Sequence, residues 1–247
     1  MLKNLESESN RVMNLCLQCR RRLLTCVCEY LKPFPTYSRF IILMHPMEFK
    51  KEKVGTGRFS HLILENSAIF VDINFDQNQE FLKALHDPEY DSYVLYPGEK
   101  VIDLSAPTVD SEFTNNRPKQ FIVIDGTWPC AKKMMKLSTC LHYIPRVSFT
   151  TNRTSAFKVK HQPMPECLST VESIHQVILE LNRLGIEKTE GKEENLIEVF
   201  SKTVDQQVEL AQDPNRQGYR KKPFSAPSER KMSKKWEKRL LFFRKDS

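Results

Sequence analysis

The stretch Phe121-Ile-Val-Ile-Asp-Gly-Thr-Trp-Pro-Cys-Ala-Lys-Lys-Met-Met135 decides how the rest of the chain is interpreted. Phe121 to Ile124 is a short apolar run rich in β-branched residues, which predicts a buried strand. Asp125-Gly126 breaks the run. Pro129 suits the first turn of a helix, where its missing N–H costs nothing. The stretch therefore predicts a strand that passes directly into a helix.

Asp125, Gly126, Thr127 and Trp128 lie at this junction between strand and helix. In an open α/β sheet, ligands bind outside the carboxyl ends of the strands, so the junction is a candidate site. A structural explanation fits the same residues, because Asp125 or Thr127 can cap the helix and Trp128 can fill the core. Spacing alone favours the structural explanation.

Length and composition allow one α/β domain with small appendages. The chain has 247 residues, of which 40% are hydrophobic, enough to form a core. No apolar run is long enough to span a bilayer, and the first residues lack the apolar region of a signal peptide. Seven cysteines, an odd number with four clustered early, do not fit a secreted disulfide framework. We expect a cytoplasmic protein with no membrane partner.

The positive charge of the chain is concentrated at its C-terminal end. Residues 214–247 contain 12 Lys and Arg against 3 Asp and Glu, a net charge of +9, whereas the whole chain carries +7. Aromatic residues are interleaved with these basic residues, which suits RNA phosphates and unpaired bases. A solvated tail without a partner explains the same composition.

Four early cysteines form a C-x2-C-x6-C-x-C pattern: Cys16, Cys19, Cys26 and Cys28. Four thiolates within thirteen positions suit tetrahedral Zn²⁺, and a site with four protein ligands is closed and structural. The second pair is closer than the common spacing, and ordinary buried or redox-active cysteines are the alternative. Three arginines, at positions 20–22, stand between the pairs and would help to keep the thiolates deprotonated.

Strand and helix patterns alternate along the remaining chain. Further strands are predicted at 38–44, 68–72, 93–98 and 143–149, and helices at 59–66, 77–86, 168–184 and 195–211. This alternation predicts a mostly parallel sheet flanked by helices. The chain contains no G-x-G-x-x-G motif, so a Rossmann cofactor site is not expected.

Several charged residues have both a binding and a structural interpretation. Arg58 follows the turn Gly55-Thr-Gly57 and suits a phosphate or carboxylate, or only starts a surface helix. Arg146 interrupts an apolar strand, so it is paired, functional, or on an edge strand. Arg153 and Lys160 lie in a polar loop and either contact RNA phosphates or are simply solvated.

A capping box, Ser169-x-x-Glu172, opens the helix predicted at 168–184. Capping would explain both of these residues. The same helix N-terminus is also suited to receive a carboxylate group of a ligand, and the two roles are compatible.

Asp125-Gly-Thr-Trp128, followed by Ala131-Lys-Lys-Met134, resembles the signature of the DTW-domain family. Members of this family move the 3-amino-3-carboxypropyl group of S-adenosylmethionine onto a uridine in tRNA. The resemblance covers roughly residues 16–210, and Gly55 departs from it because the family usually has Asn there. The other matching motifs occur in the same order: the four cysteines, His45-Pro-x-Glu48, Thr56-Gly-Arg58, Leu95-x-Pro-Gly98 and Leu168-Ser-Thr-x-Glu172.

The resemblance implies a SPOUT-like arrangement, in which the C-terminal part can be knotted. It supports zinc at the four cysteines and suggests three regions. Residues 1–35 form an N-terminal segment with the zinc site, residues 36–213 the α/β catalytic domain, and residues 214–247 a basic tail.

The resemblance also implies roles for individual residues. Asp125, Thr127 and Trp128 are the expected catalytic residues. The expected cofactor-binding residues are Tyr96, Pro97, Gly98, Asp125, Gly126, Ser169, Thr170 and Glu172. The expected RNA-binding residues, which follow from residue type and position and not from the resemblance, are Arg58, Arg146, Arg153 and Lys160.

The implied reaction is attack by N3 of an unpaired tRNA uridine on the γ-carbon of the methionine moiety, with release of methylthioadenosine. A general base would remove the N3 proton, and Asp125 is the candidate, although its ordinary pKa of about 3.9 is low for the task unless burial raises it. Asp125 could instead hold the cofactor amine. Trp128 stacks on adenine or uracil, or supports the loop.

Three other functions are compatible with the sequence. The chain could modify ribosomal RNA by the same chemistry, or methylate RNA as a SPOUT-type enzyme that uses the same cofactor. From a different class, it could be a zinc-containing RNA-binding module without catalysis. The sequence gives no sign of an obligate protein partner.

Overall fold

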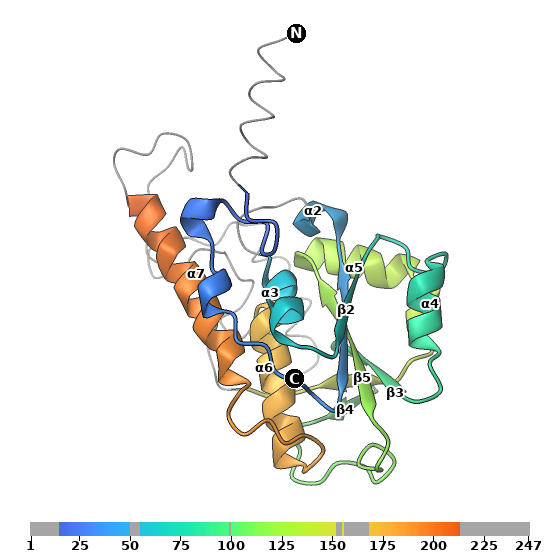
Figure 1. Cartoon of the computed structure of the whole chain (residues 1–247). Helices are drawn as coiled ribbons and strands as arrows, with labels where there is room; N and C mark the ends of the chain where they lie inside the picture. Colours follow the sequence, from blue (N-terminus) through green and yellow to red (C-terminus); the bar gives the residue numbers. More distant parts are fainter. Residues whose placement is uncertain (1–14, 50–54, 99, 152–154, 156–167, 213–247) are drawn as a thin grey trace, which may run out of the picture.

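A computed structural model describes residues 15–49, 55–98, 100–151, 155 and 168–212 (Figure 1). Its centre is a six-stranded sheet with the strand order β2-β1-β5-β3-β6-β4, and each neighbouring pair is parallel. The strands are β1 (Arg39–Met44), β2 (Ser67–Val71), β3 (Asp91–Leu95), β4 (Val101–Asp103), β5 (Lys119–Asp125) and β6 (Arg146–Ser148). The prediction of a mostly parallel α/β sheet is confirmed, and a C-terminal knot stays a prediction.

Helices cover both faces of the sheet (Figure 1). One face carries α3 (Thr56–Ile63), α6 (Thr170–Arg183) and α7 (Glu194–Gln212), and the other carries α4 (Gln79–Leu85) and α5 (Trp128–Leu137). Side chains of the central strands alternate between the two layers. Phe40 and Ile42 of β1 pack with the first set of helices, and Ile41 and Leu43 pack with the second.

The strand β5 occupies the centre of the sheet, between β1 and β3. Its register pairs Asp125 with Met44, so the two strands end at the same level. The junctions that follow β1 and β5 therefore open at the same edge of the sheet. This carboxyl edge is where the predicted site residues are expected.

Some predicted elements differ in their bounds from the observed ones. The helix predicted at 59–66 is α3, which begins three residues earlier, at Thr56, and ends at Ile63. The short helix α2 (Pro46–Phe49) and the strand β4 were not predicted. Both elements are three or four residues long, too short for hydrophobic periodicity to show them.

The helix α6 begins and ends as its sequence indicates. The capping box of Ser169 and Glu172 is confirmed, and Gly185 adopts a φ of 74° just after the helix. The chain between α6 and α7 then returns to the sheet, where the buried Glu187 accepts hydrogen bonds from the backbone N–H groups of Tyr37 and Ser38. This contact fixes the start of β1.

The segment that carries the four cysteines, residues 15–35 and here called the cysteine segment, packs onto the same core as the sheet. Val27 and Phe34 are buried in the layer that includes α7. Arg21 is also buried, and its guanidinium donates to Thr203 at 3.0 Å and to Gln206 at 3.1 Å, both on α7. Arg21 therefore anchors the segment to α7, and its support of the thiolates stays a prediction.

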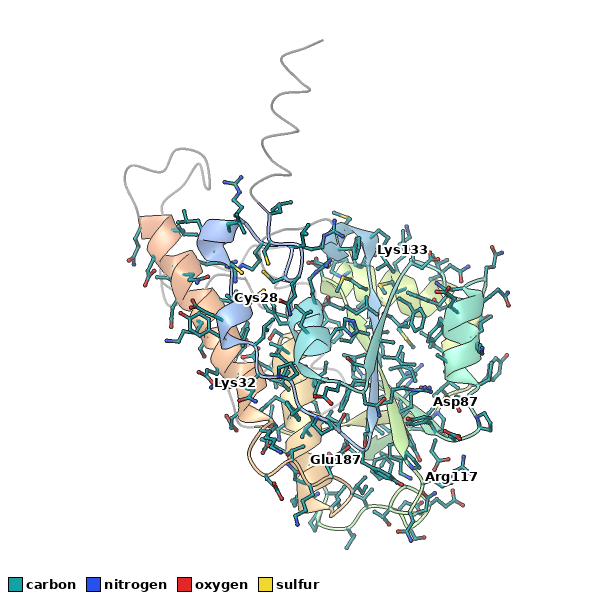
Figure 2. The ribbon with its side chains drawn as sticks, viewed as in Figure 1. Cys28, Lys32, Asp87, Arg117, Lys133 and Glu187 are labelled. Carbon is teal, nitrogen blue, oxygen red and sulfur yellow. The ribbon has the colours of Figure 1, made fainter. Side chains whose placement is uncertain are left out.

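The two ends of the sheet carry different groups of side chains. Figure 2 shows Lys133 of α5 near the carboxyl edge, and Arg117 and Glu187 at the opposite end.

Among the helices of the described ranges, none is long and apolar enough to cross a membrane.

Candidate active site

Asp125 is the last residue of β5, and its side chain is only 6% exposed. Its backbone carbonyl accepts a hydrogen bond from the N–H of His45 at 3.0 Å, which joins the ends of β5 and β1. Its Oδ1 accepts a hydrogen bond from the Thr170 hydroxyl at 2.6 Å. The first turn of α6 is thereby held against the end of β5.

Gly57 lets the first turn of α3 approach the same carboxylate. A Cβ at position 57 would lie 2.6 Å from Oδ2 of Asp125 and 3.0 Å from Cγ2 of Ile42, closer than real Cβ contacts. Only glycine fits this position without displacement of its neighbours. Asp125 therefore lies between the N-terminal turns of α3 and α6.

The N-terminus of α6 is organised by Glu172. Its Oε2 accepts hydrogen bonds from the Ser169 N–H at 2.7 Å, from the Ser169 hydroxyl at 2.6 Å and from the Ser155 hydroxyl at 2.8 Å. Glu172 and Ser169 thus shape the turn that presents Thr170 to Asp125. Direct contact of these two residues with a cofactor stays a prediction.

Tyr96, Trp128 and Arg146 form a second group at this edge. The rings of Tyr96 and Trp128 are 6.4 Å apart and tilted by 57°, and the Arg146 guanidinium lies 5.7 Å from the centre of the Tyr96 ring. Burial raises the pKa of Tyr96, and the charge of Arg146 partly opposes this shift. A Cβ at Gly98 would lie 2.6 Å from Nη1 of Arg146, so this glycine makes room for the guanidinium.

Thr127 and Trp128 only partly fit the purely structural roles of a helix cap and a core residue. Thr127 is the N-cap residue of α5, but its side chain makes no capping hydrogen bond. Trp128 is only partly buried, so it does not simply fill the core. Gly126 keeps the turn narrow, because a Cβ there would be 3.3 Å from Cβ of Cys130. The catalytic roles of Thr127 and Trp128 stay predictions.

Arg58 points toward α2 rather than into open solvent. Its guanidinium lies 4.9 Å from the ring centre of Phe49, and the guanidinium of Arg20 lies 5.2 Å from the same ring. Burial lowers the pKa of Arg58, and the positive charge of Arg20 lowers it further. Phe49 had no assigned role in the sequence, and Arg20 was expected only to help to keep the thiolates deprotonated. Only their place beside the four cysteines and the His45 motif could have indicated one.

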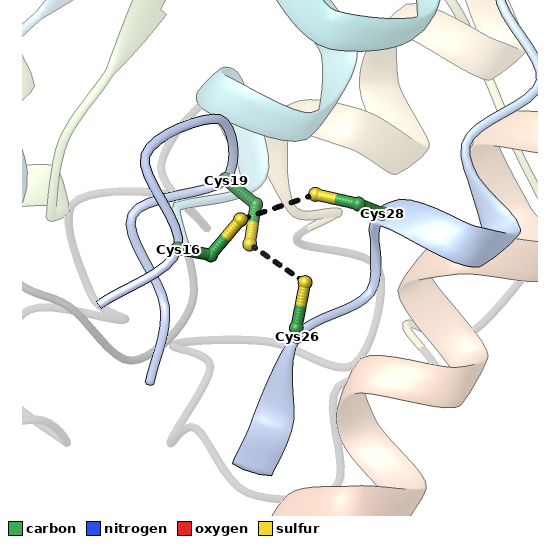
Figure 3. Close-up of side chains that lie close together, drawn as sticks. All are labelled: Cys16, Cys19, Cys26 and Cys28. Atoms are coloured by element: carbon green, nitrogen blue, oxygen red, sulfur yellow. Dashed lines mark hydrogen bonds between the residues drawn. The ribbon is translucent and has the colours of Figure 1, made fainter. Parts of the chain in front are cut away.

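The four cysteines form one compact cluster (Figure 3). All four Sγ atoms lie within 4.8 Å of one another, with 3.5 Å between Cys16 and Cys28 and 3.8 Å between Cys19 and Cys26. Tetrahedral zinc with Zn–S bonds of about 2.3 Å requires Sγ atoms about 3.8 Å apart. The cluster therefore fits a structural zinc ion.

The ionisation of the cluster is uneven. A hydrogen bond from the Cys19 backbone N–H is the main cause that lowers the pKa of Cys16, to about 6. Burial raises the pKa of Cys26 and of Cys28, and the neighbouring thiol groups add to this for Cys28. One thiol with a lowered pKa, beside thiols whose pKa is raised, is suited to bind a metal cation, because the cation displaces the remaining protons when it binds.

Part of the predicted RNA-binding surface lies outside the described residues. This applies to Arg153, Lys160 and the basic tail at 214–247. Arg58 and Arg146, by contrast, are described: Arg58 lies in the first turn of α3, and the Arg146 side chain lies beside Tyr96 and Gly98, in the turn after β3. The roles of all four residues in RNA binding stay predictions.

The parallel sheet and the buried carboxylate at its carboxyl edge define an α/β protein with a candidate ligand site in the usual place for this class. A family model described as "DTW domain" matches residues 13–208. The chain therefore belongs to the DTW-domain family, as its signature residues predict.

Curated relatives have a consistent name, tRNA-uridine aminocarboxypropyltransferase 2. The protein from Drosophila melanogaster is 30% identical over 172 residues, which cover 67% of this chain and 65% of the relative. The proteins from Macaca fascicularis and Mus musculus are each 28% identical, over 68% of this chain and 57% of their own length. The chain thus spans about three fifths of these relatives. No solved structure matches the chain significantly.

Proposed function

We propose that this protein transfers the 3-amino-3-carboxypropyl group of S-adenosylmethionine to N3 of a loop uridine in tRNA. The observation that carries this proposal is the setting of Asp125, which is buried between two helix N-termini and hydrogen-bonded to Thr170. The name of the relatives supports the reaction class and the tRNA substrate.

The donor would lie along the carboxyl edge of the sheet. The turn Tyr96-Pro-Gly98 follows β3, which is hydrogen-bonded to β5, and so borders the Asp125 turn. In the proposed arrangement this turn and Gly126 contact the adenosyl part. The N-terminus of α6, with Ser169, Thr170 and Glu172, receives the carboxylate of the methionine part, because its N–H groups favour negative charge.

The chemistry requires orientation and removal of one proton. The bond from uridine N3 to the γ-carbon forms while the bond from that carbon to sulfur breaks, and methylthioadenosine leaves. Asp125 accepts the N3 proton, and the hydrogen bond from Thr170 fixes the direction in which its carboxylate faces. Thr127 and Trp128, which follow Asp125 and Gly126, would align the uracil ring and separate it from water.

The RNA would approach over the half-buried rings and basic groups beside this turn. Tyr96 and Trp128 offer aromatic surfaces to an unpaired base. Arg58 and Arg146 would contact phosphates, together with Arg153, Lys160 and the basic tail. The four cysteines would hold structural zinc, and a cytoplasmic location without an obligate protein partner completes the proposal.

Mass spectrometry of nucleosides from unmodified tRNA, incubated with the protein and S-adenosylmethionine, tests the function directly. The expected product is an aminocarboxypropyl uridine together with methylthioadenosine. A methylated nucleoside would instead place the protein among the methyltransferases. Unchanged nucleosides from tRNA, together with a modified product from ribosomal RNA offered in parallel, would reassign the substrate.

A further inference from the structure

Phe49 is the common neighbour of two arginines from different parts of the chain. Arg58 comes from the first turn of α3, and Arg20 comes from the loop between the two cysteine pairs. Each guanidinium lies about 5 Å from the centre of the Phe49 ring, at 4.9 Å and 5.2 Å, respectively. The aromatic face attracts both cations and so brings two like charges together.

The backbone of the cysteine segment holds Arg20 in this position. Arg20 has a φ of 55°, which side-chain-bearing residues rarely adopt. Its N–H donates to the carbonyl of Cys16 at 2.8 Å, and the N–H of Cys16 donates to the carbonyl of Arg21 at 2.7 Å. This closed turn surrounds two of the four cysteines, so a zinc ion bound there would also fix the position of Arg20.

Cys19 is the one opposite charge that acts on the pKa of Arg58 among the described residues, and it raises that pKa against the effects of burial and of Arg20. Among the ion pairs of the described residues, neither Arg20 nor Arg58 takes part. Arg20 is exposed and Arg58 is half-buried, so both guanidiniums can reach an external anion. Two arginines without a carboxylate partner, oriented by one ring, are suited to a phosphate group.

The position of this cluster relates it to the proposed active site. Arg58 directly follows Gly57, the residue that packs against the carboxylate of Asp125. Phe49 ends α2, which begins two residues after β1. Figure 1 shows α2 and the cysteine segment at the same end of the molecule as the start of α5.

We propose that Arg20, Phe49 and Arg58 form a phosphate-binding site for the RNA strand next to the modified uridine, and that the cysteine segment is needed to present Arg20. This inference rests on the proposed function for the identity of the RNA. It assigns the zinc site a part in substrate binding in addition to its structural role.

The test is the affinity of the full-length, zinc-loaded protein for unmodified tRNA, measured over a series of salt concentrations. Arg20→Asn removes the charge and keeps a residue that tolerates positive φ. We expect roughly tenfold weaker binding, the usual effect of losing a charge-assisted hydrogen bond. The slope of log K against log[salt] should become shallower by about 0.7, as for one lost phosphate contact on a single strand. Arg58→Lys should weaken binding by a smaller factor, since it keeps the charge but loses the fork of donors.

Arg22→Asn is the matched control, because Arg22 is an exposed arginine of the same loop, and the arginines over the Phe49 ring among the described residues are Arg20 and Arg58. We expect it to change affinity less than twofold. Zinc content, measured by mass spectrometry under native conditions, should remain one ion per chain in both variants. Equal loss of affinity in Arg20→Asn and Arg22→Asn would overturn the proposal, because only general charge would then matter.

The dependence on the cysteine segment has its own measurement. Removal of zinc by a chelator should weaken tRNA binding of the parent protein and change that of Arg20→Asn much less. An equal further loss in both proteins would refute the coupling. The outcome for the catalytic proposal is separate. If the parent forms the product and Arg20→Asn binds tRNA with normal affinity, the proposed function stands and this phosphate site is rejected. A parent that forms no product but shows the selective loss keeps the site and rejects the function.

Discussion

The strand β5 has a buried charge at each end, and the two are stabilised in different ways. Lys119 begins the strand, is fully buried, and is bound by carboxylate and amide partners: its Nζ lies 3.2 Å from Oδ2 of Asp91 and also donates to Asn115. Asp125 ends the strand and has a hydroxyl and two helix N-termini around it.

The difference indicates what each end is for. The ion pair of the buried Lys119 with the partly exposed Asp91 satisfies both charges within the protein, so the amino end of β5 has a structural role. Asp125 instead lies beside the Thr170 hydroxyl and the first turns of α3 and α6, at the carboxyl edge of the sheet, where a ligand is expected to bind. We therefore expect substitutions of Lys119 to lower stability and substitutions of Asp125 to lower turnover.

The largest expected effect is on turnover in Asp125→Asn. If Asp125 is the base, the rate of uridine modification should fall by about 10³-fold, within the usual range for general-base catalysis. The melting temperature should change little, because the amide keeps the size of the side chain and can still accept the Thr170 hydrogen bond. Single-turnover assays with saturating S-adenosylmethionine and thermal unfolding curves measure the two effects.

Asp72→Asn serves as the control for that experiment, since Asp72 directly follows β2, which is separated from β5 by β1. It should leave turnover close to that of the parent. Normal turnover in Asp125→Asn would remove this residue from the chemistry and leave it as a ligand for the cofactor amine.

Gly57→Ala should reduce turnover by roughly 10²-fold, the scale expected when a reacting group is displaced by about 1 Å. The new Cβ would collide with Oδ2 of Asp125, which cannot easily move because Thr170 holds the other oxygen. Gly98→Ala is the matched variant, whose Cβ meets only the flexible end of Arg146. Its effect should be smaller and mainly on the KM for tRNA. Equal effects on turnover would contradict a special constraint at Asp125.

Lys119→Met should lower the free energy of unfolding by about 2–3 kcal/mol, less than the usual cost of breaking a buried pair, because Asp91 keeps Arg117 as a partner at 2.9 Å. Turnover of the folded protein should be unchanged. Urea unfolding monitored by circular dichroism gives the stability, and Lys83→Met, at an exposed position on α4, is the control. A loss of turnover without a loss of stability would reverse the assignment of the two ends.

Of the two charged ends of β5, the sequence predicts the role of Asp125 but not that of Lys119. Asp125 could be identified because it directly follows an apolar run and belongs to a recognisable motif. Lys119 could not, because its partner Asp91 is 28 positions away and pairing between strands brings the two together. Arg21 shows the same limit, since its partners on α7 are more than 180 positions away. Local patterns thus predict strands, caps and turns, whereas contacts of buried charges depend on the complete fold.

The smallest expected effect is in the pH dependence of stability at the amino end of β5. Burial alone would raise the pKa of Asp91, but a hydrogen bond from Asn115 and the ammonium of Lys119 hold it below its ordinary value of 3.8. A carboxyl group with a lowered pKa contributes stability above its unfolded pKa, and this contribution is lost as the pH falls through the folded value.

Lys119→Met removes one cause of the lowered pKa of Asp91. The loss of stability between pH 5 and pH 3 should therefore be smaller in this variant than in the parent, as measured by urea midpoints at the two pH values. Lys83→Met should lose as much stability as the parent over the same range. An equal loss in Lys119→Met would show that Asn115 and Arg117 maintain the Asp91 carboxylate without Lys119.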